Sequence, residues 1–220
     1  MKKLIFKLLF WIFIILFIIF SIIFGLGYVK YKKATDNISL IDKVKEIRES
    51  NNYTKLEDIS EDYKNAVVSI EDHRFYNHNG IDIFSIIRST YVNLKSKSLS
   101  YGASTITQQV GRLMYFSQEK SFIRKVSEIF VAFELEKSFS KDEILELYLN
   151  LMYFGNGYYG IYDASYGYFN KSPKDLSLYE ATYLAGIPNA PSVYSENKNL
   201  AEERRIQVEN AMKKYGYIEK

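Results

Sequence analysis

The sequence predicts a mainly α-helical domain behind a single N-terminal transmembrane helix. In several segments, apolar residues recur at the i, i+3, i+4, i+7 spacing of an amphipathic helix. Three segments begin with the Ser/Thr-x-x-Glu/Gln pattern of a capping box, which starts helices. The three prolines all lie from Pro173 onward, so none breaks a helix in the middle of the chain.

The N-terminal segment has the composition of a membrane anchor. Residues 8–25 carry no charge, and the wider apolar stretch 4–29 contains only Lys7, which makes it long enough to span a bilayer. The stretch is too long for the apolar core of an ordinary signal peptide, and no small-x-small cleavage site follows it. We therefore expect residues 1–33 to be an uncleaved anchor. Lysines on its two sides are balanced, so charge does not orient it.

The charge balance gives no support for nucleic acid as a partner. The 220 residues include 29 basic and 26 acidic ones. Six lysines flank the anchor, so the rest of the chain has 23 basic residues and a net charge of −3. Such a balance does not favour nucleic acid as a partner. Because cysteine is absent, disulfides and thiolate metal sites are excluded.

The part of the chain after the anchor divides into two regions. Residues 34–57 are polar and mixed in charge, which predicts a juxtamembrane connection with one short helix around residues 41–47. Residues 58–220 are expected to form one domain, which is long enough for a proper core. Within it, residues 94–101 contain two lysines and three serines and are predicted to form a mobile loop.

A charged segment, residues 70–82, lies between two predicted helices. The apolar face of the first helix is formed by residues at helical spacing, namely Tyr63, Ala66, Val67 and Ile70. Asp58 or Ser60 can cap its start, and Glu71 falls at its end. Asp82 can cap the second helix. Taken alone, the segment is most simply a solvated connection between helices with two surface aromatics, Phe75 and Tyr76.

A small-residue segment, residues 102–109, leads into another predicted helix, with Thr105 and Gln108 at capping-box spacing. The free N–H groups of such a helix start can bind phosphate-like anions. A series of basic residues follows it, consisting of Arg112, Lys120, Arg124 and Lys125.

Residues 121–137 predict a strong helix. Its core side is expected to consist of Phe122, Val126, Ile129, Phe130 and Phe133. Lys125 and Glu128 are three residues apart and share one face. A surface ion pair explains this spacing on its own.

The C-terminal third contains two more capping boxes, which begin at Ser140 and Ser177. Between them, residues 150–167 mix tyrosines with glycines, which suits either a sugar-stacking or membrane-interface surface or a tyrosine-rich shell of the core. The last charged segment, residues 200–215, is most simply a surface helix.

In this order, the segments resemble the lysozyme-like peptidoglycan glycosyltransferases of glycosyltransferase family 51, which polymerise lipid II, in their monofunctional, membrane-anchored form. The resemblance covers roughly residues 55–195 and is carried by five blocks: Glu71-Asp72-His73-Arg74-Phe75-Tyr76 with His78, Gly80 and Asp82; Gly102-Ala103-Ser104-Thr105-Ile106-Thr107-Gln108-Gln109; Arg124-Lys125 with Glu128; residues 146–150 followed by Tyr153-Phe154-Gly155; and Glu180-Ala181 with residues 188–192.

The resemblance implies that the C4 hydroxyl of lipid II attacks the anomeric carbon of a glycan held on polyprenyl diphosphate, with inversion to a β-1,4 link. It makes Glu71 the base, with a pKa expected to be raised by partial burial. Glu128 is the second acid, which would orient the basic groups or hold a divalent cation such as Mg²⁺ or Mn²⁺. The motif residues Asp72, His73, Arg74 and Phe75 would support Glu71.

The other matched residues would bind the diphosphate leaving group and the donor sugar. The basic set of Arg112, Lys120, Arg124 and Lys125 would neutralise the departing diphosphate. The polar set of Ser104, Thr105, Gln108 and Gln109 would position the diphosphate and the donor sugar. Three positions depart mildly from the pattern: Ala103 stands where a second glycine is common, and Arg112 and Lys120 keep the expected charge but exchange its type.

The resemblance also implies where in the cell the protein lies and which proteins it joins. The chain would lie in the cytoplasmic membrane of a bacterium, with its domain on the outer face, and would join other cell-wall synthesis and division proteins. With only 220 residues, it is expected to make glycan without a transpeptidase domain to cross-link it.

Three other interpretations remain open. A lysozyme-like enzyme that cleaves finished glycan needs one dominant glutamate but has no use for a cationic cluster. An inactive membrane-anchored scaffold would be expected to have lost some of the motif acids, and none is missing. A metal site formed by His73, His78 and Asp82 is disfavoured, because five-residue histidine spacing does not match a pair of ligands on one helix.

Overall fold

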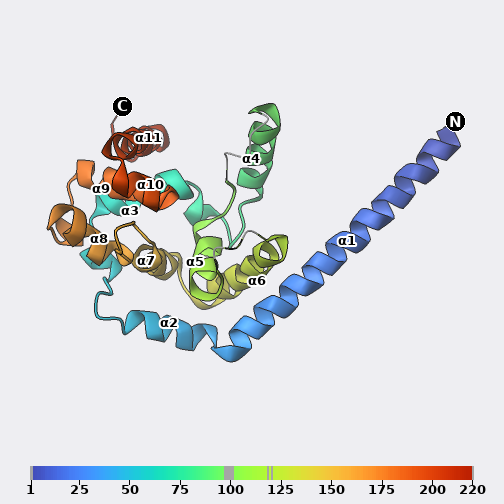
Figure 1. Cartoon of the computed structure of the whole chain (residues 1–220), viewed down its shortest axis with the longest axis horizontal. Coiled ribbons are helices and arrows are strands. Elements are labelled where there is room, and N and C mark those ends of the chain that lie inside the picture. Colours follow the sequence, from blue (N-terminus) through green and yellow to red (C-terminus); the bar gives the residue numbers. More distant parts are fainter. Residues whose placement is uncertain (1, 97–101, 118, 120, 220) are drawn as a thin grey trace.

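The computed structural model describes residues 2–96, 102–117, 119 and 121–219, and is helical almost throughout (Figure 1). The helices are α1 (Lys2–Asn37), α2 (Leu40–Arg48), α3 (Glu61–Glu71), α4 (Ile83–Ser96), α5 (Ile106–Tyr115), α6 (Phe122–Ser138), α7 (Lys141–Leu151), α8 (Gly160–Phe169), α9 (Leu178–Gly186), α10 (Pro191–Glu196) and α11 (Lys198–Tyr215). Within the described residues, extended pairing is limited to one isolated bridge between Tyr153 and Tyr159. The predicted mainly α class is therefore confirmed.

The helix starts follow the predicted caps. Ser60 caps α3, and the pairs Thr105–Gln108, Ser140–Glu143 and Ser177–Glu180 all form complete capping boxes. Each box satisfies N–H groups that a helix start leaves without intrahelical partners. Asp82 accepts hydrogen bonds from the backbone of Phe84 and Ser85, so it caps α4 as expected.

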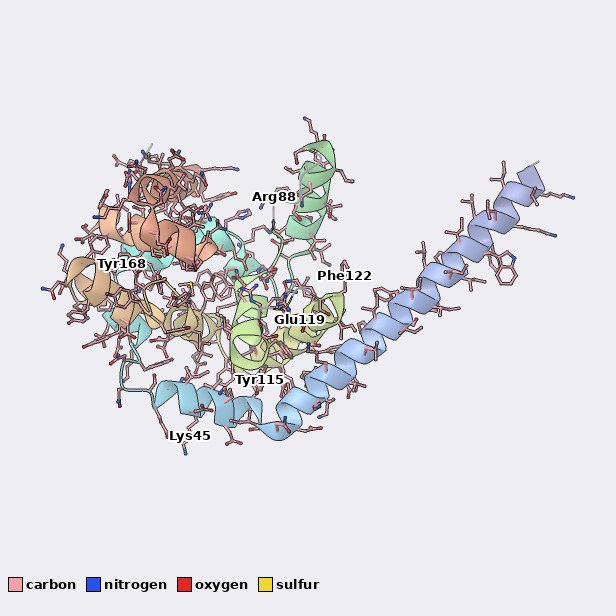
Figure 2. The ribbon with its side chains drawn as sticks, viewed as in Figure 1. Lys45, Arg88, Tyr115, Glu119, Phe122 and Tyr168 are labelled. Carbon is pink, nitrogen blue, oxygen red and sulfur yellow. The ribbon has the colours of Figure 1, made fainter. Side chains whose placement is uncertain are left out.

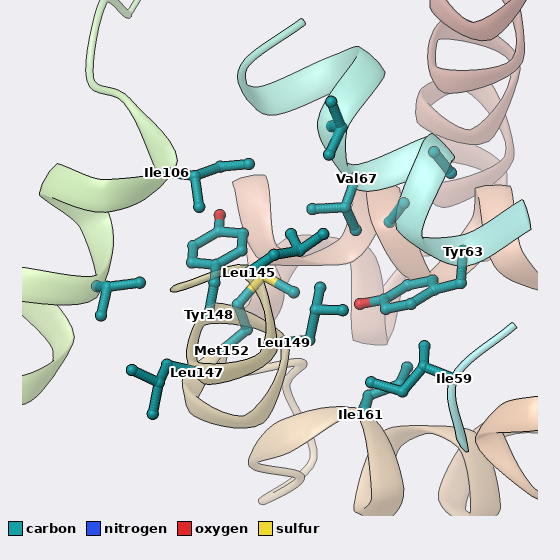
Figure 3. Close-up of a cluster of buried hydrophobic side chains, with 14 of the residues drawn as sticks. Ile59, Tyr63, Val67, Ile106, Leu145, Leu147, Tyr148, Leu149, Met152 and Ile161 are labelled. Carbon is teal, nitrogen blue, oxygen red and sulfur yellow. The ribbon is translucent and has the colours of Figure 1, made fainter. Parts of the chain in front are cut away.

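The core is built around α7, which is surrounded by α3, α5 and α8 (Figures 1 and 3). Tyr63 and Val67 of α3 face Leu145 and Leu149 of α7 in this cluster, and all four side chains are buried (Figure 3). Burying each aliphatic side chain of this size contributes about 1.5–3 kcal/mol. This packing fixes the end of α3, where Glu71 lies.

The N-terminal helix α1 extends away from the domain over most of its length (Figure 1). Its segment Lys3–Asn37 is long and apolar enough to cross a membrane. A short helix, α2, lies where one was expected, and Leu40 and Val44 of α2 are buried in the core.

The predicted core side of the helix at residues 121–137 is wrong. Phe122 is 82% exposed and Phe133 is 49% exposed. The buried residues of α6 are instead Arg124, Ser127, Glu128, Val131, Ala132 and Leu135. The reason is that α6 packs on two sides, against α5 and against α1, so its phenylalanines do not all face the domain interior.

Two predictions about the chain outside this helix also need correction. Helix α4 continues to Ser96, so the first part of the predicted mobile loop is helical, and residues 97–101 lie outside the described residues. Helix α11 is not simply a surface helix, because it packs against α3 and α9. Its buried residues Ala201, Val208 and Met212 share one helical face, which the surrounding charges obscure in the sequence.

Candidate active site

A cleft of about 940 Å³ lies where the end of α3, the start of α5, α4 and α11 meet. Seven of the predicted site residues line it: Glu71, Asp72, His73, Ser104, Thr105, Gln109 and Arg112. Arg88, which projects from α4 (Figure 2), also lines it. From α11 come Arg204, Gln207, Asn210, Ala211, Lys214 and Tyr215. The cleft therefore collects polar groups from segments far apart in the sequence.

Glu71 is the last residue of α3, and its carboxylate is held in the cleft by neighbouring polar groups. Its side chain is 18% exposed and therefore still reaches solvent. The Nε2 of Gln109 donates to Glu71 Oε2 at 2.9 Å, and Arg204 Nη2 lies 4.0 Å from Oε1. Tyr148 in turn donates to Gln109 Oε1 at 3.2 Å. Burial and the charge of Glu71 hold the pKa of Tyr148 well above its ordinary value, so this hydroxyl stays a donor.

Asp72 joins the end of α3 to the start of α5. Its Oδ2 accepts the backbone N–H of Ile106 at 3.0 Å and lies 2.9 Å from His78 Nε2. Thr105 donates its hydroxyl to the carbonyl of Gly80 at 2.7 Å. Gly80 has φ +75°, a left-handed conformation that glycine adopts at little cost. These contacts fix the charged segment 70–82 against α5.

The expectation that the start of α5 offers free N–H groups to an anion is largely wrong. The N–H of Ile106 is bound by Asp72, that of Gln108 by the hydroxyl of Thr105, and that of Thr105 by Gln108 Oε1. Gln108 is buried in this capping box and does not line the cleft. At this edge, Ser104 lines the cleft, and its hydroxyl can donate a hydrogen bond to a ligand.

Three charged residues of α6 form a compact cluster beside Ser104. Glu128 is only 1% exposed, and it forms an ion pair with Arg124 through Oε1 and with Lys125, at 3.1 Å, through Oε2. Lys125 Nζ also contacts Ser104 Oγ. Two cations share one carboxylate, so the cluster has an excess positive charge next to the cleft. Burial lowers the pKa of Lys125, and the charge of Glu128 only partly offsets this.

Arg74 and Phe75 do not line the cleft, and their contacts stabilise the turn that follows α3. Arg74 Nε lies 3.1 Å from Asp82 Oδ2, and its guanidinium lies 4.7 Å from the centre of the Phe84 ring. Phe75 is fully buried beneath Lys141, whose Nζ lies 4.4 Å from the ring centre. His73 lines the cleft and stacks on Tyr215 with ring centres 4.2 Å apart. Burial and the charge of Arg88 lower the pKa of His73, which favours its neutral form.

The site residues that the structure describes do not fit a metal site. Both oxygens of Glu128 are already paired with cations. His78 pairs with Asp72, while His73 stacks on Tyr215, so the two histidines are not brought together around Asp82. Among the described residues, no group of three or more His, Cys, Asp or Glu side chains is arranged to hold a metal ion.

Sequence reasoning missed several residues of the cleft, among them Tyr148, Arg204 and Tyr215. Each is an ordinary helical residue in the sequence, and only the fold brings it beside Glu71 or His73. The spacing of Ala201, Val208 and Met212 was an available signal, because it marks α11 as a packed helix. Lys120, which was predicted to neutralise the departing diphosphate, lies outside the described residues.

Comparisons with known proteins match most of the chain to one family. A family model described as Transglycosylase matches residues 37–213, which run from the end of α1 through most of α11. Penicillin-binding protein 1A of Neisseria gonorrhoeae is 46% identical over 162 residues, covering 73% of this chain and 20% of the relative. Penicillin-binding protein 1F of Bacillus subtilis (strain 168) is 43% identical over 167 residues, covering 74% and 23%. The chain thus spans about a fifth of the length of these relatives.

Proposed function

Because the chain belongs to the transglycosylase family, glycosyltransferase family 51, we propose that it polymerises peptidoglycan glycan strands from lipid II. The C4 hydroxyl oxygen of lipid II forms a bond to the anomeric carbon of the growing strand. The bond from that carbon to the polyprenyl diphosphate breaks, and the diphosphate leaves with the electron pair. The configuration inverts to give a β-1,4 link.

The observation that carries this proposal is a cleft whose lining includes the carboxylate of Glu71, with a cationic cluster beside it that contacts the lining residue Ser104. Glu71 takes the proton of the attacking hydroxyl, and its carboxylate is oriented for this by Gln109. Lys125 and Arg124 stabilise the charge that builds on the departing diphosphate. Arg112 lines the cleft and adds a third cation. A glycan-cleaving enzyme needs the carboxylate but not the cations, because its leaving group is a sugar hydroxyl.

Lys125 gives this proposal a pH signature. Its pKa is lowered by burial, so the ammonium loses its proton at a lower pH than an exposed lysine does. If the charged form of Lys125 stabilises the leaving group, the polymerisation rate falls as the pH becomes alkaline. This fall occurs at a lower pH than the one at which an exposed lysine loses its proton. We expect Lys125→Arg to shift this fall to higher pH, because the guanidinium stays protonated. The measurement is kcat as a function of pH. If the alkaline fall in kcat occurs at the same pH in Lys125→Arg as in the wild type, a group other than Lys125 causes it.

The membrane setting is supported by α1 and by the apolar face of α4. Helix α4 exposes a set of large apolar side chains, namely Ile83, Phe84, Ile86, Ile87, Tyr91 and Leu94. We infer that this face contacts lipid beside the anchor and keeps the cleft at the headgroups of both substrates. In this arrangement, the domain lies on the outer face of the cytoplasmic membrane, where it can join other cell-wall synthesis and division proteins.

Charge on the α4 face should weaken this contact. Ile87 is 62% exposed, so Ile87→Asp leaves the core intact while placing a charge against the lipid. We expect the apparent KM for lipid II in vesicles to rise by about tenfold, which is about 1.4 kcal/mol and less than the roughly 2.5–3.5 kcal/mol that a charge costs at the centre of a bilayer. The rate on lipid II in detergent should stay close to that of the wild type. An equal loss in both media would locate the defect in the protein rather than in its membrane contact.

The direct test is to incubate the full chain with labelled lipid II, with and without Mg²⁺ or Mn²⁺, and to resolve the products by size. A ladder of lengthening glycans supports the proposal. Preformed glycan is tested in parallel. If it is shortened and no ladder forms, the chain is a glycan-cleaving enzyme. If neither substrate changes, it is an inactive scaffold. Lys125→Ala sharpens the distinction, because a glycan-cleaving enzyme tolerates it and a polymerase does not.

A further inference from the structure

The C-terminal part of α1 packs against α6, the helix that carries Arg124, Lys125 and Glu128 (Figure 1). The ring of Phe130 lies 5.0 Å from that of Phe24 and 5.5 Å from that of Tyr31, measured between ring centres. Tyr31 also donates its hydroxyl to Glu134 Oε2 at 2.8 Å. The anchor is therefore in specific contact with α6 and is more than a flexible tether.

The two helices approach most closely at Gly27. A Cβ atom added there would lie 2.5 Å from Val126 Cγ1 and 2.6 Å from Val126 Cβ. Ordinary carbon contacts are about 3.5–4.0 Å, so any side chain at position 27 forces the helices apart by about 1 Å. Because Val126 Cβ is attached directly to the backbone, a change of rotamer does not relieve this contact.

The buried hydroxyl of Ser127 on α6 lies at the same contact between the two helices. Ser127 is fully buried, and its Oγ lies 2.9 Å from the carbonyl oxygen of Gly27 and 2.9 Å from that of Ile123. The hydroxyl therefore links the backbone of α1 to that of α6. Ser127 lies immediately between Val126, which meets Gly27, and Glu128, which pairs with both cations.

A second glycine, Gly111 of α5, packs closely against another side of α6. A Cβ atom added at Gly111 of α5 would lie 3.0 Å from Val131 Cγ1. Helix α6 is thus in close contact with α1 at Gly27 and with α5 at Gly111. Because close-packed interiors are hard to compress and transmit strain, a change of spacing at either contact alters the position of α6.

We propose that Gly27 of the anchor is a positioning residue, whose close contact with Val126 and Ser127 sets where α6 presents Lys125 and Glu128 to the cleft. The proposal rests on the proposed function for its effect on rate, although the position of α6 can be measured without it. Lys125 is not one of the described residues that line the cleft, and its contact with Ser104 connects it to that lining. A shift of α6 by about 1 Å would break that contact, and a misplacement of this size can lower a rate by about 100-fold.

Gly25 provides a matched control on the same helix. A Cβ atom added there meets nothing within 4 Å among the described residues. We therefore compare Gly27→Leu with Gly25→Leu in the full chain, reconstituted in lipid vesicles. For Gly27→Leu we expect kcat on lipid II to fall by about 100-fold with KM within about twofold. Gly25→Leu should match the wild type. The double variant with Gly27→Ala and Val126→Gly moves the small residue to the other helix and should recover most of the rate.

Amide hydrogen exchange of α6 gives a readout that needs no substrate. Gly27→Leu should raise the exchange rate of α6 amides, while Gly25→Leu should not. If kcat and the exchange of α6 in Gly27→Leu both equal those of the wild type, the proposal is overturned and the proposed function stands. If the wild type makes no glycan, the proposed function fails, and unchanged exchange in Gly27→Leu would overturn the positioning role as well.

Discussion

Glu71→Gln is expected to abolish glycan polymerisation almost completely, with a fall in kcat of about 10²–10⁴-fold. The amide has the shape of the carboxylate and can still accept the hydrogen bond from Gln109 Nε2, so the cleft should keep its geometry. It cannot accept the proton of the attacking hydroxyl. The rate is measured with labelled lipid II, and binding of the unreacted substrate is measured separately. We expect binding to change by less than about threefold, because the loss concerns the transition state.

Glu61 offers a control on the same helix. Its side chain is 73% exposed and forms an ion pair with Lys64, three residues along. Glu61→Gln therefore changes a carboxylate of α3 without touching the cleft, and its rate should equal that of the wild type. A Glu71→Gln variant that polymerises lipid II at the normal rate would show that another group removes the proton.

The second large effect is expected from Glu128→Leu, which should lower the free energy of unfolding by about 3–5 kcal/mol. The substitution nearly keeps the side-chain volume but leaves Arg124 buried without a counter-charge. Breaking a buried ion pair by removing one partner carries this cost because the remaining charge has lost its solvation. Denaturant unfolding of the full chain in detergent measures it. Polymerisation should also be lost, since Glu128 holds Lys125 beside Ser104.

A double variant separates charge from packing. Arg124→Met combined with Glu128→Leu removes both partners of the buried pair, and replacing such a pair by apolar side chains is often neutral or stabilising. We expect its stability to return close to that of the wild type while its polymerisation stays absent. Glu57→Leu, on an exposed turn, is the surface control. If Glu128→Leu were as stable as the wild type, the cluster would not be the buried charge network described above.

Much of the secondary structure follows from local chemistry, and for that reason the sequence predicts it well. The capping boxes that begin at Thr105, Ser140 and Ser177 depend on residues three apart, and all three form. The transmembrane segment depends only on an uninterrupted apolar run, and α1 has that character. The position of Glu71 at a helix end follows from the periodicity before it and the turn residues after it.

The orientation of helices that pack on more than one side could not be predicted. Phe122 and Phe133 look like core residues, yet both are exposed, because the interior of the domain is reached by Val131 and Leu135 instead. Periodicity identifies an apolar face but not what covers it. In α6, part of that face is covered by the anchor helix, which is close to it only in the folded chain.

The sequence by itself determined the fold class, the anchor and the chemical types of the candidate site, because residue type, spacing and capping are local properties. Only the tertiary structure decided which of these residues meet. It placed Gln109 and Arg204 beside Glu71, Ser104 beside Lys125, and Asp72 at the start of α5. Those pairs come from different helices or from the turns next to them, and their distances depend on how the helices pack. Packing is set by the fit of whole surfaces, which no short stretch of sequence contains.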